Sequence, residues 1–211
     1  MSDKCKKIKI KIIDLGLNNI FSLYHALNDI GFKVSILDVN NNKIDTDILV
    51  IPGVGAFPKA INFLKKNNLD KKIKEFNDKN RVIFGICLGM QLLFDSSSEF
   101  GNHKGLSLIS GTVKKIDKKL IKVPNIGWFP ITHTNKKNIF LSKKFNNEFF
   151  YFVHSYYCNP LNQENIITTT KISKFNFCSS VQKKKLLGVQ FHPEKSGDKG
   201  MQILRNLYKL V

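Results

Sequence analysis

The sequence predicts a single α/β domain built on a doubly wound, mostly parallel sheet with helices on both faces. Short apolar runs such as DILVI, residues 47–51, have the continuous hydrophobic character of strands buried on both faces. Amphipathic helical segments separate these runs, which is the order of a parallel sheet with crossover helices. Two glycine-bearing loops directly follow predicted strands, where open α/β sheets place their sites. The 211 residues suit one such domain, 1–211.

The first half of the chain alternates predicted strands and helices. Apolar runs predict strands at Ile8 to Ile13, Phe32 to Leu37, Asp47 to Ile51 and Val82 to Ile86. Helical spacing predicts helices at Phe21 to Ile30, Lys59 to Lys66 and Leu69 to Asn77, and after Cys87 through Met90, Leu93 and Phe94. Gly31 is expected to end the first helix because glycine readily adopts the left-handed conformation of a helix C-terminus.

The second half, from Gly105 onward, is richer in short β segments that are expected to extend the sheet with antiparallel strands. These segments are Leu106 to Val113, Val123 to Ile131, Phe149 to Tyr157, Ile166 to Ile172, Phe177 to Gln182 and Leu186 to Phe191. Residues 114–122 and 132–147 are rich in lysine and asparagine, lack periodicity and predict loops. A final amphipathic helix is expected at Gly200 to Leu210, where it would cover the sheet.

The segment Arg81 to Phe94, RVIFGICLGMQLLF, predicts a strand, a sharp turn at Cys87 and a helix. Gly85 and Gly89 flank the cysteine and allow the backbone to fold back closely, as in a nucleophile elbow. A thiol placed just before a helix favours its thiolate form through the helix dipole. Leu88 would offer its backbone N–H to an oxyanion. The alternative is a small buried core cysteine.

The loop Pro52 to Phe57, PGVGAF, follows a predicted strand and leads into a helix. Its exposed backbone amides could bind an anion, although a PGxG sequence by itself is more typical of an ordinary βα turn. This loop and the cysteine turn both lie at carboxyl ends of parallel strands. If Val54 turns its N–H toward Cys87, Val54 and Leu88 would form a two-donor oxyanion hole.

His192 lies at the end of the apolar run LLGVQF, and Glu194 follows two residues later, on the same side of an extended segment. A cysteine nucleophile needs a base that takes its proton and later protonates a leaving amine, and an imidazole held by a carboxylate does both. Cys87, His192 and Glu194 therefore form a candidate triad. The other histidines compete less well: His154 lies in an apolar strand and is expected in the core, and His25, His103 and His133 lie on helix or loop segments.

Composition narrows the classes of function. The 34 lysines and arginines exceed the 16 acidic residues, for a net charge of +18, which attracts nucleic acid or an acidic partner. Because the lysines are scattered and no aromatic RNA-binding motif accompanies them, we predict a solvated surface without specific nucleic-acid binding. The four cysteines lack metal-ligand spacing, which predicts no metal site and a reduced cytoplasmic compartment. Lysines within the N-terminal apolar run argue against a signal peptide or a membrane span.

The motifs GICLGMQLLF and QFHPE resemble those of the class I glutamine amidotransferases. The fuller set, DLGxxN, PGVGAF, VPNIGW, YFVHSYY and QFHPEKSG, is similar to the glutaminase subunits of imidazole glycerol phosphate synthase, and the resemblance covers nearly the whole chain. The elbow and HPE motifs indicate the superfamily, and the other motifs indicate the subfamily.

The resemblance implies a flavodoxin-like α/β fold, no cofactor and hydrolysis of L-glutamine to L-glutamate and ammonia through a thioester on Cys87. It implies that His192 transfers protons and that Glu194 orients His192. It also implies a heterodimer in which a (β/α)8-barrel cyclase uses the ammonia to make imidazole glycerol phosphate and AICAR in histidine biosynthesis. By position, the glutamine-binding residues would be Gly53, Gln91 and Glu99, and the partner interface or ammonia gate would include Asn19, Trp128, Tyr151 and Lys195.

Departures from the family pattern leave alternatives open. Asn18 replaces the usual glycine before Asn19, and PNIGWF lacks a histidine and an asparagine usual in that motif. Relatives in surface-polysaccharide loci supply ammonia to a sugar amidotransferase, which is the alternative acceptor. Trp128 and Tyr151 also suit core aromatics. A noncatalytic scaffold would be expected to lose part of the triad, and a hydrolase of γ-glutamyl peptides would work without a partner.

Overall fold

The computed structural model describes residues 8–16, 20–40, 43–134 and 138–211. Within these ranges an eight-stranded sheet has the order β2-β1-β3-β4-β14-β13-β12-β9. Its strands are β1 Lys9–Ile12, β2 Lys33–Ile36, β3 Ile48–Ile51, β4 Val82–Ile86, β9 Thr132–His133, β12 Ile166–Ile172, β13 Phe175–Lys183 and β14 Leu186–Val189. The first five strands of that order run parallel, and the last three are antiparallel. The order β2-β1-β3-β4-β14 is the flavodoxin-like order, which confirms the predicted fold class.

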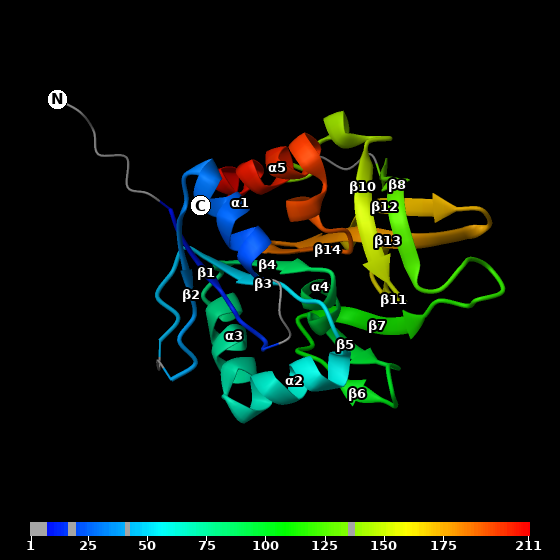
Figure 1. Cartoon of the computed structure of the whole chain (residues 1–211). Coiled ribbons are helices and arrows are strands. Elements are labelled where there is room, and N and C mark those ends of the chain that lie inside the picture. The colour runs from blue at the N-terminus through cyan, green and yellow to red at the C-terminus, as the bar shows by residue number, and fades with distance from the viewer. Residues whose placement is uncertain (1–7, 17–19, 41–42, 135–137) are drawn as a thin grey trace.

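Helices cover both faces of this sheet (Figure 1). Helices α1 Phe21–Ile30 and α5 Gly197–Arg205 lie on one face, and α2 Phe57–Lys66 and α3 Leu69–Asp78 lie on the other. Successive β3 side chains alternate between the two cores: Ile48 and Val50 pack with α1 and α5, whereas Leu49 and Ile51 pack with α2 and α3. Both faces of the strand are therefore buried, as its continuous apolar run predicts.

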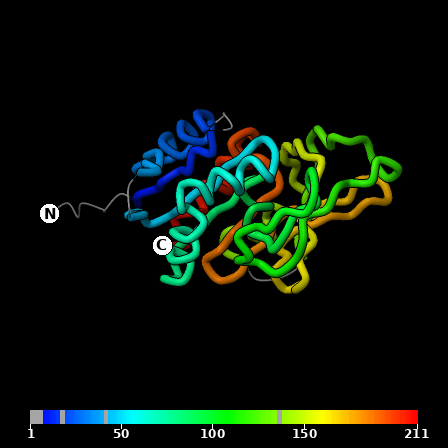
Figure 2. Tube along the Cα trace, turned by 90° about the horizontal axis from the view of Figure 1, so that it is seen from below, coloured from blue at the N-terminus to red at the C-terminus, as the bar shows by residue number. Residues whose placement is uncertain are grey.

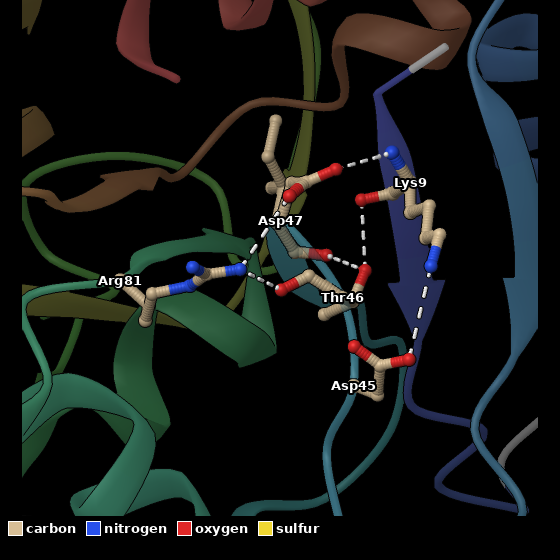
Figure 3. A network of polar contacts seen from close by, with 6 residues as sticks. Lys9, Asp45, Thr46, Asp47 and Arg81 are labelled. Carbon is tan, nitrogen blue, oxygen red and sulfur yellow. Dashed lines mark hydrogen bonds and ion pairs between the residues drawn. The ribbon is translucent and has the colours of Figure 1, made fainter. Parts of the chain in front are cut away.

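A polar network aligns the amino ends of β1, β3 and β4 (Figure 3). The backbone N–H of Lys9 donates to Asp47 Oδ2 over 2.8 Å, and Thr46 Oγ1 donates to the Lys9 carbonyl over 2.8 Å. Arg81, just before β4, donates to the Thr46 carbonyl and lies 3.5 Å from Asp47 Oδ1. These bonds fix the relative register of three strands at the edge opposite their carboxyl ends.

The β-rich part of the chain forms two smaller sheets at the end of the molecule away from β1 and β2 (Figures 1 and 2). One is a ribbon of β8 Asn125–Pro130 and β10 Phe149–His154. The other has the order β11-β7-β5-β6, with β5 Phe94–Ser97, β6 His103–Lys104, β7 Ile109–Lys115 and β11 Tyr156–Pro160. The predicted antiparallel additions are therefore present.

The helix after Cys87 is shorter than predicted. Helix α4 spans Leu88–Leu92, and Phe94 begins strand β5 instead of continuing the helix. The carbonyls of Leu92 and Phe94 accept hydrogen bonds from the N–H groups of residues 106 and 107. These carbonyls therefore do not accept the bonds that would continue the helix. A Cβ on Gly105 would lie 2.2 Å from the Phe94 carbonyl oxygen, so this close approach requires glycine.

Two other predicted segments differ from the structure. The single strand expected at Phe149 to Tyr157 bends at Ser155 into β10, which pairs with β8, and β11, which pairs with β7 in a different sheet. The segment 132–147, expected to be a loop, contains β9 and a 3-10 turn, Lys143–Phe145, whose phenylalanine is buried. The final helix begins at Gly197 and becomes a 3-10 turn, Asn206–Leu210. No helix of the described residues is long and apolar enough to span a bilayer.

Candidate active site

Cys87 lies in the turn between β4 and α4, and its backbone is strained. Its φ is 53° and ψ is −109°, a left-handed value that a residue with a side chain rarely adopts. The Cys87 N–H donates to the carbonyl of Val189 over 2.7 Å, and the side chain is buried. This is the strand, strained turn and helix of a nucleophile elbow. Because α4 has five residues, its dipole is smaller than the sequence predicts.

The glycines around Cys87 serve close packing. A Cβ on Gly85 would lie 2.7 Å from the backbone of Gly89, and a Cβ on Gly89 would lie 1.7 Å from the Ile51 carbonyl oxygen. Neither glycine has a positive φ, so the strained conformation belongs to the cysteine itself. The glycine pattern therefore predicted the turn correctly, but the glycines act by letting α4 pack against the ends of β3 and β4.

His192 and Glu194 follow β14, the strand that neighbours β4 in parallel register. His192 Nδ1 lies 2.8 Å from Glu194 Oε1, and both side chains are almost completely buried. His192 Nε2 has no hydrogen-bond partner among the described residues. The carboxylate thus orients the ring through one nitrogen and leaves the other available for proton transfer.

The electrostatic surroundings of His192 favour its charged form. Burial by itself lowers the pKa of the imidazole, but its charge and hydrogen-bonding interactions with Cys87 and Glu194 outweigh burial and raise the pKa to about 10. A thiolate on Cys87 and an imidazolium on His192 stabilise each other in this arrangement. The structure therefore brings all three residues of the predicted triad into one electrostatic unit.

A cavity of about 220 Å³ opens beside Cys87. Its walls include Leu88, Gln91, Glu99 and Val54, four residues that the sequence analysis assigned to substrate binding or the oxyanion hole. Glu99 Oε2 accepts a hydrogen bond of 2.7 Å from the N–H of Phe57, the first residue of α2. Gly53 lines a separate cavity of about 20 Å³ with His192 and Glu194.

The PGVGAF loop directs a backbone carbonyl, which is a hydrogen-bond acceptor, toward the elbow. The Leu88 N–H donates to the Gly53 carbonyl over 3.4 Å. Because C=O and N–H point in opposite directions across a trans peptide, the Val54 N–H points away from the Leu88 amide. The two donors expected to form an oxyanion hole are therefore close in space but are not aimed together in this conformation.

Three of the four expected interface residues lie together. Trp128 on β8 and Tyr151 on β10 are register partners, with ring centroids 6.0 Å apart, and Lys195 is exposed in the turn after Glu194. Trp128 is 51% exposed, so it is not a core aromatic residue. The Tyr151 carbonyl accepts a bond from the His192 N–H over 2.9 Å. Asn19 lies outside the described residues.

His154 is a satisfied core residue, as its apolar strand predicted. Nδ1 is 2.9 Å from the Tyr156 carbonyl oxygen, and Nε2 is 3.0 Å from Asn125 Nδ2. Burial lowers the pKa of His154 to about 4, an effect that the charge of His192 increases and the Tyr156 hydrogen bond partly opposes. The ring lines the 220 Å³ cavity in its neutral form.

Sequence reasoning missed two residues that support the site. Gln190 is completely buried, and its Nε2 lies 3.5 Å from Cys87 Sγ. Ser196 Oγ donates to the His192 carbonyl and accepts from the Tyr151 N–H. Both residues stand within the motif QFHPEKSG, so their position next to His192 was the available signal. The described residues contain no group of three or more potential ligands that could hold a metal ion.

Comparison with known proteins places this chain in a family. The family model Glutamine amidotransferase class-I matches residues 11–210. "Imidazole glycerol phosphate synthase subunit HisH" of Chlorobaculum tepidum is 38% identical over 92% of this chain and 96% of that protein. The protein of the same name from Listeria innocua is 41% identical over 96% of both. The structure of PurLQS from Thermotoga maritima covers 96% of this chain and 98% of that one with a TM-score of 0.78, and at 16% identity it supports the fold. The chain therefore belongs to the class-I glutamine amidotransferase family.

Proposed function

We propose that this chain is the glutaminase subunit of an imidazole glycerol phosphate synthase, with residues 1–211 forming one amidotransferase domain. The observation that carries the proposal is the buried Cys87, His192 and Glu194 unit beside a cavity of about 220 Å³. A strained cysteine before a helix and an imidazole paired with a carboxylate are the parts that acyl transfer to sulfur needs.

In the first half of the reaction, the Cys87 thiolate attacks the side-chain amide carbon of glutamine. The new S–C bond pushes the carbonyl electrons onto oxygen, and collapse of this intermediate breaks the C–N bond. The His192 imidazolium gives its proton to the departing nitrogen, which leaves as ammonia, and a glutamyl thioester remains on Cys87.

In the second half, neutral His192 takes a proton from water while the water oxygen attacks the thioester carbon. The C–S bond then breaks, glutamate leaves and the Cys87 thiolate and His192 imidazolium are restored. Glu194 takes no proton in either step and holds Nδ1 of the ring at 2.8 Å.

Glu99 and Gln91 are proposed to hold the substrate. Both line the same cavity as Cys87, and the Glu99 carboxylate suits the α-ammonium group of glutamine. Gly53 contributes through its backbone, since a Cβ there would lie 2.8 Å from the Leu88 Cβ. The absence of a Cβ lets the PGVGAF loop lie close against the elbow.

The oxyanion hole requires a rearrangement. With the Gly53 carbonyl on the Leu88 N–H, the Leu88 donor is occupied by an acceptor of the protein itself. Rotation of the Gly53–Val54 peptide would remove that acceptor and turn the Val54 N–H inward, so both donors could stabilise the intermediate. We propose that glutamine hydrolysis is slow until this rotation occurs.

The ribbon of β8 and β10 is the proposed docking face for a (β/α)8-barrel cyclase in a heterodimer. Ile126, Trp128 and Phe149 are each more than half exposed there, and aromatic residues are enriched at protein interfaces. The Tyr151 carbonyl bond to the His192 N–H links the ribbon directly to the triad. Asn19, Trp128, Tyr151 and Lys195 are proposed to line or gate the path of ammonia to the partner.

The names of the relatives favour the histidine pathway as the destination of the ammonia. The relatives cited above carry the imidazole glycerol phosphate synthase name at 38% and 41% identity over nearly the full chain. Supply of ammonia to a sugar amidotransferase would use the same chemistry at Cys87 but is not favoured by these names. We therefore propose a cyclase partner that forms imidazole glycerol phosphate and AICAR.

The experiment measures glutamate formation from glutamine by this chain alone and with the cyclase subunit and its nucleotide ligand. We expect the partner to stimulate the rate at least about tenfold, because it must favour the rotated Gly53–Val54 peptide. Cys87→Ala should abolish turnover in both conditions. Cys178→Ala is the matched control, since Cys178 is another buried free thiol, and it should retain turnover.

Two results would contradict parts of this proposal. Turnover that survives Cys87→Ala would exclude the thioester mechanism. An active chain that no cyclase subunit stimulates, but that a glutamine-analogue thiol reagent labels at Cys87, would leave the glutaminase in place and exclude the histidine-pathway partner.

A further inference from the structure

Gln190 lies in a chain of three buried polar side chains that ends at the nucleophile. It directly follows β14, is completely buried, and its own N–H donates to the Ser179 carbonyl over 2.9 Å. Gln91 Nε2 donates to Gln190 Oε1 over 3.1 Å, and Gln190 Nε2 donates to Cys87 Sγ over 3.5 Å. The three residues thus form one continuous hydrogen-bonded path, Gln91 to Gln190 to Cys87.

The direction of this path is set by a backbone carbonyl. Gln91 Nε2 also donates to the Tyr156 carbonyl over 3.1 Å. Because a carbonyl oxygen only accepts hydrogen bonds, the amide nitrogen of Gln91 must face it. The same nitrogen then faces Gln190, which requires the oxygen of Gln190 there and turns its nitrogen toward Cys87. Strand β11, which contains Tyr156, therefore determines that the sulfur meets a donor.

Cys87 Sγ lies between an acceptor and this donor. The Val153 carbonyl oxygen is 3.7 Å from the sulfur and accepts from the protonated thiol. An N–H donor stabilises the negative sulfur instead. The Gln190 donor matters for a negative sulfur here because two other sources of stabilisation are weak. Helix α4 is short, and the Leu88 N–H is already bonded to Gly53.

We propose that Gln190 stabilises the reactive thiolate of Cys87, and that Gln91 acts as a positioning residue that aims the Gln190 carboxamide at the sulfur. This deepens the proposed glutaminase function and rests on Cys87 being its nucleophile. Gln91 thus has a role besides lining the substrate cavity: its nitrogen transmits the orientation set at Tyr156 to the sulfur.

The test is the pH dependence of the rate at which iodoacetamide alkylates Cys87 in the full chain, from about pH 5 to about pH 10, followed by mass spectrometry of the Cys87 peptide. Gln190→Met keeps a similar volume and removes the donor. We expect the midpoint of its profile to rise by about one pH unit, with a rate at neutral pH about tenfold lower. Gln190→Glu, which replaces the donor by an acceptor, should move the midpoint at least as far.

Gln182→Met is the matched control. Gln182 is also hydrogen-bonded through both ends of its carboxamide, to Asn138 and to the Lys184 carbonyl, but it lies on β13 and its hydrogen bonds do not reach Cys87. Its alkylation profile should match the wild type. Gln91→Met should move the midpoint upward by less than Gln190→Met, and this variant decides the question if Gln190→Met does not fold.

Alkylation needs no glutamine, so this test is separate from that of the proposed function. A folded Gln190→Met variant with the wild-type profile would overturn the role of Gln190, even if glutaminase activity were intact. A shifted profile in a chain that never hydrolyses glutamine would support the role of Gln190 and contradict the proposed function. A shift with Gln182→Met as large as that with Gln190→Met would also overturn the inference.

Discussion

Two buried histidines, His192 after β14 and His154 at the end of β10, differ in charge although burial acts on both. His192 pairs with Glu194 over 2.8 Å, and its pKa is raised to about 10 by Cys87 and Glu194. His154 bonds the Tyr156 carbonyl and the Asn125 side chain, and its pKa is lowered to about 4. Burial lowers the pKa of both rings, so the neighbours make the difference.

One ring suits catalysis and the other suits structure because only one of them has a nitrogen without a partner in the described part of the chain. Both nitrogens of His154 have partners, so it has no free position for a proton in transit. His192 keeps Nε2 without a partner among the described residues and is oriented through Nδ1. A carboxylate on one nitrogen and an open second nitrogen are the features that identify a general acid and base.

The largest expected effect is the loss of glutaminase activity when His192 is replaced. His192→Asn removes the group that protonates the leaving ammonia and activates water. We expect kcat for glutamine hydrolysis to fall about 10⁴-fold in the partner-stimulated complex. Steady-state measurement of glutamate formation checks this. A loss below about tenfold would mean that another group transfers the proton.

A smaller loss of activity is expected when the negative charge of Glu194, the partner of His192, is removed. Glu194→Gln keeps a hydrogen-bond acceptor near Nδ1 but removes the carboxylate that stabilises the imidazolium. We expect kcat to fall about 10³-fold, with KM for glutamine changing far less because Glu194 does not line the substrate cavity. Full activity in this variant would show that ring orientation alone suffices.

The smallest effect concerns stability and distinguishes His154. Its pKa is about 4 in the folded chain and about 6.5 in the unfolded chain, so the unfolded chain takes up the proton first as the pH falls. Its contribution is complete above pH 6.5, and the free energy of unfolding should drop by about 3 kcal/mol between pH 6.5 and pH 4. His154→Gln should remove that drop in urea unfolding measured across this range.

The contribution of His192 to the free energy of unfolding should depend on pH in the opposite direction and over a different pH range. Its folded pKa is raised, so its stabilisation is complete below about pH 6.5 and is lost as the pH rises toward 10. The two windows do not overlap, and one titration series therefore measures both. The control is His25→Gln, an exposed histidine on α1, which should leave both slopes in place. Equal slopes in His154→Gln and wild type would contradict the assignment of His154.

The parallel strands, the elbow and the residues of the candidate triad were predictable because each leaves a local trace. Buried parallel strands require continuous apolar runs, and Gly89 is required because a Cβ would collide with the Ile51 carbonyl. Strand β5 was missed because the helical spacing of Leu93 and Phe94 is equally compatible with burial in a strand. The N–H groups of residues 105–109 donate hydrogen bonds to the backbone of residues 92–95, and these bonds decide for the strand over the helix.

The path from Gln91 through Gln190 to Cys87 could not be predicted from the sequence. Gln190 and Cys87 are 103 residues apart, and Gln91 and the Tyr156 carbonyl are 65 apart. The direction of a carboxamide depends on which acceptor lies beside it. The hydrogen bond that occupies the Leu88 amide could not be predicted either, because the orientation of the Gly53 peptide does not depend on the pattern of side chains.

The sequence by itself determined the alternation of strands and helices, the glycines of the elbow and the residue types of the candidate triad, because periodicity and steric size act over short stretches of chain. The tertiary structure decided which histidine is charged, which amide faces the sulfur and whether the oxyanion donors are free. Protonation and hydrogen-bond direction depend on partners from distant strands, and these meet only when the sheets and the ribbon assemble around Cys87.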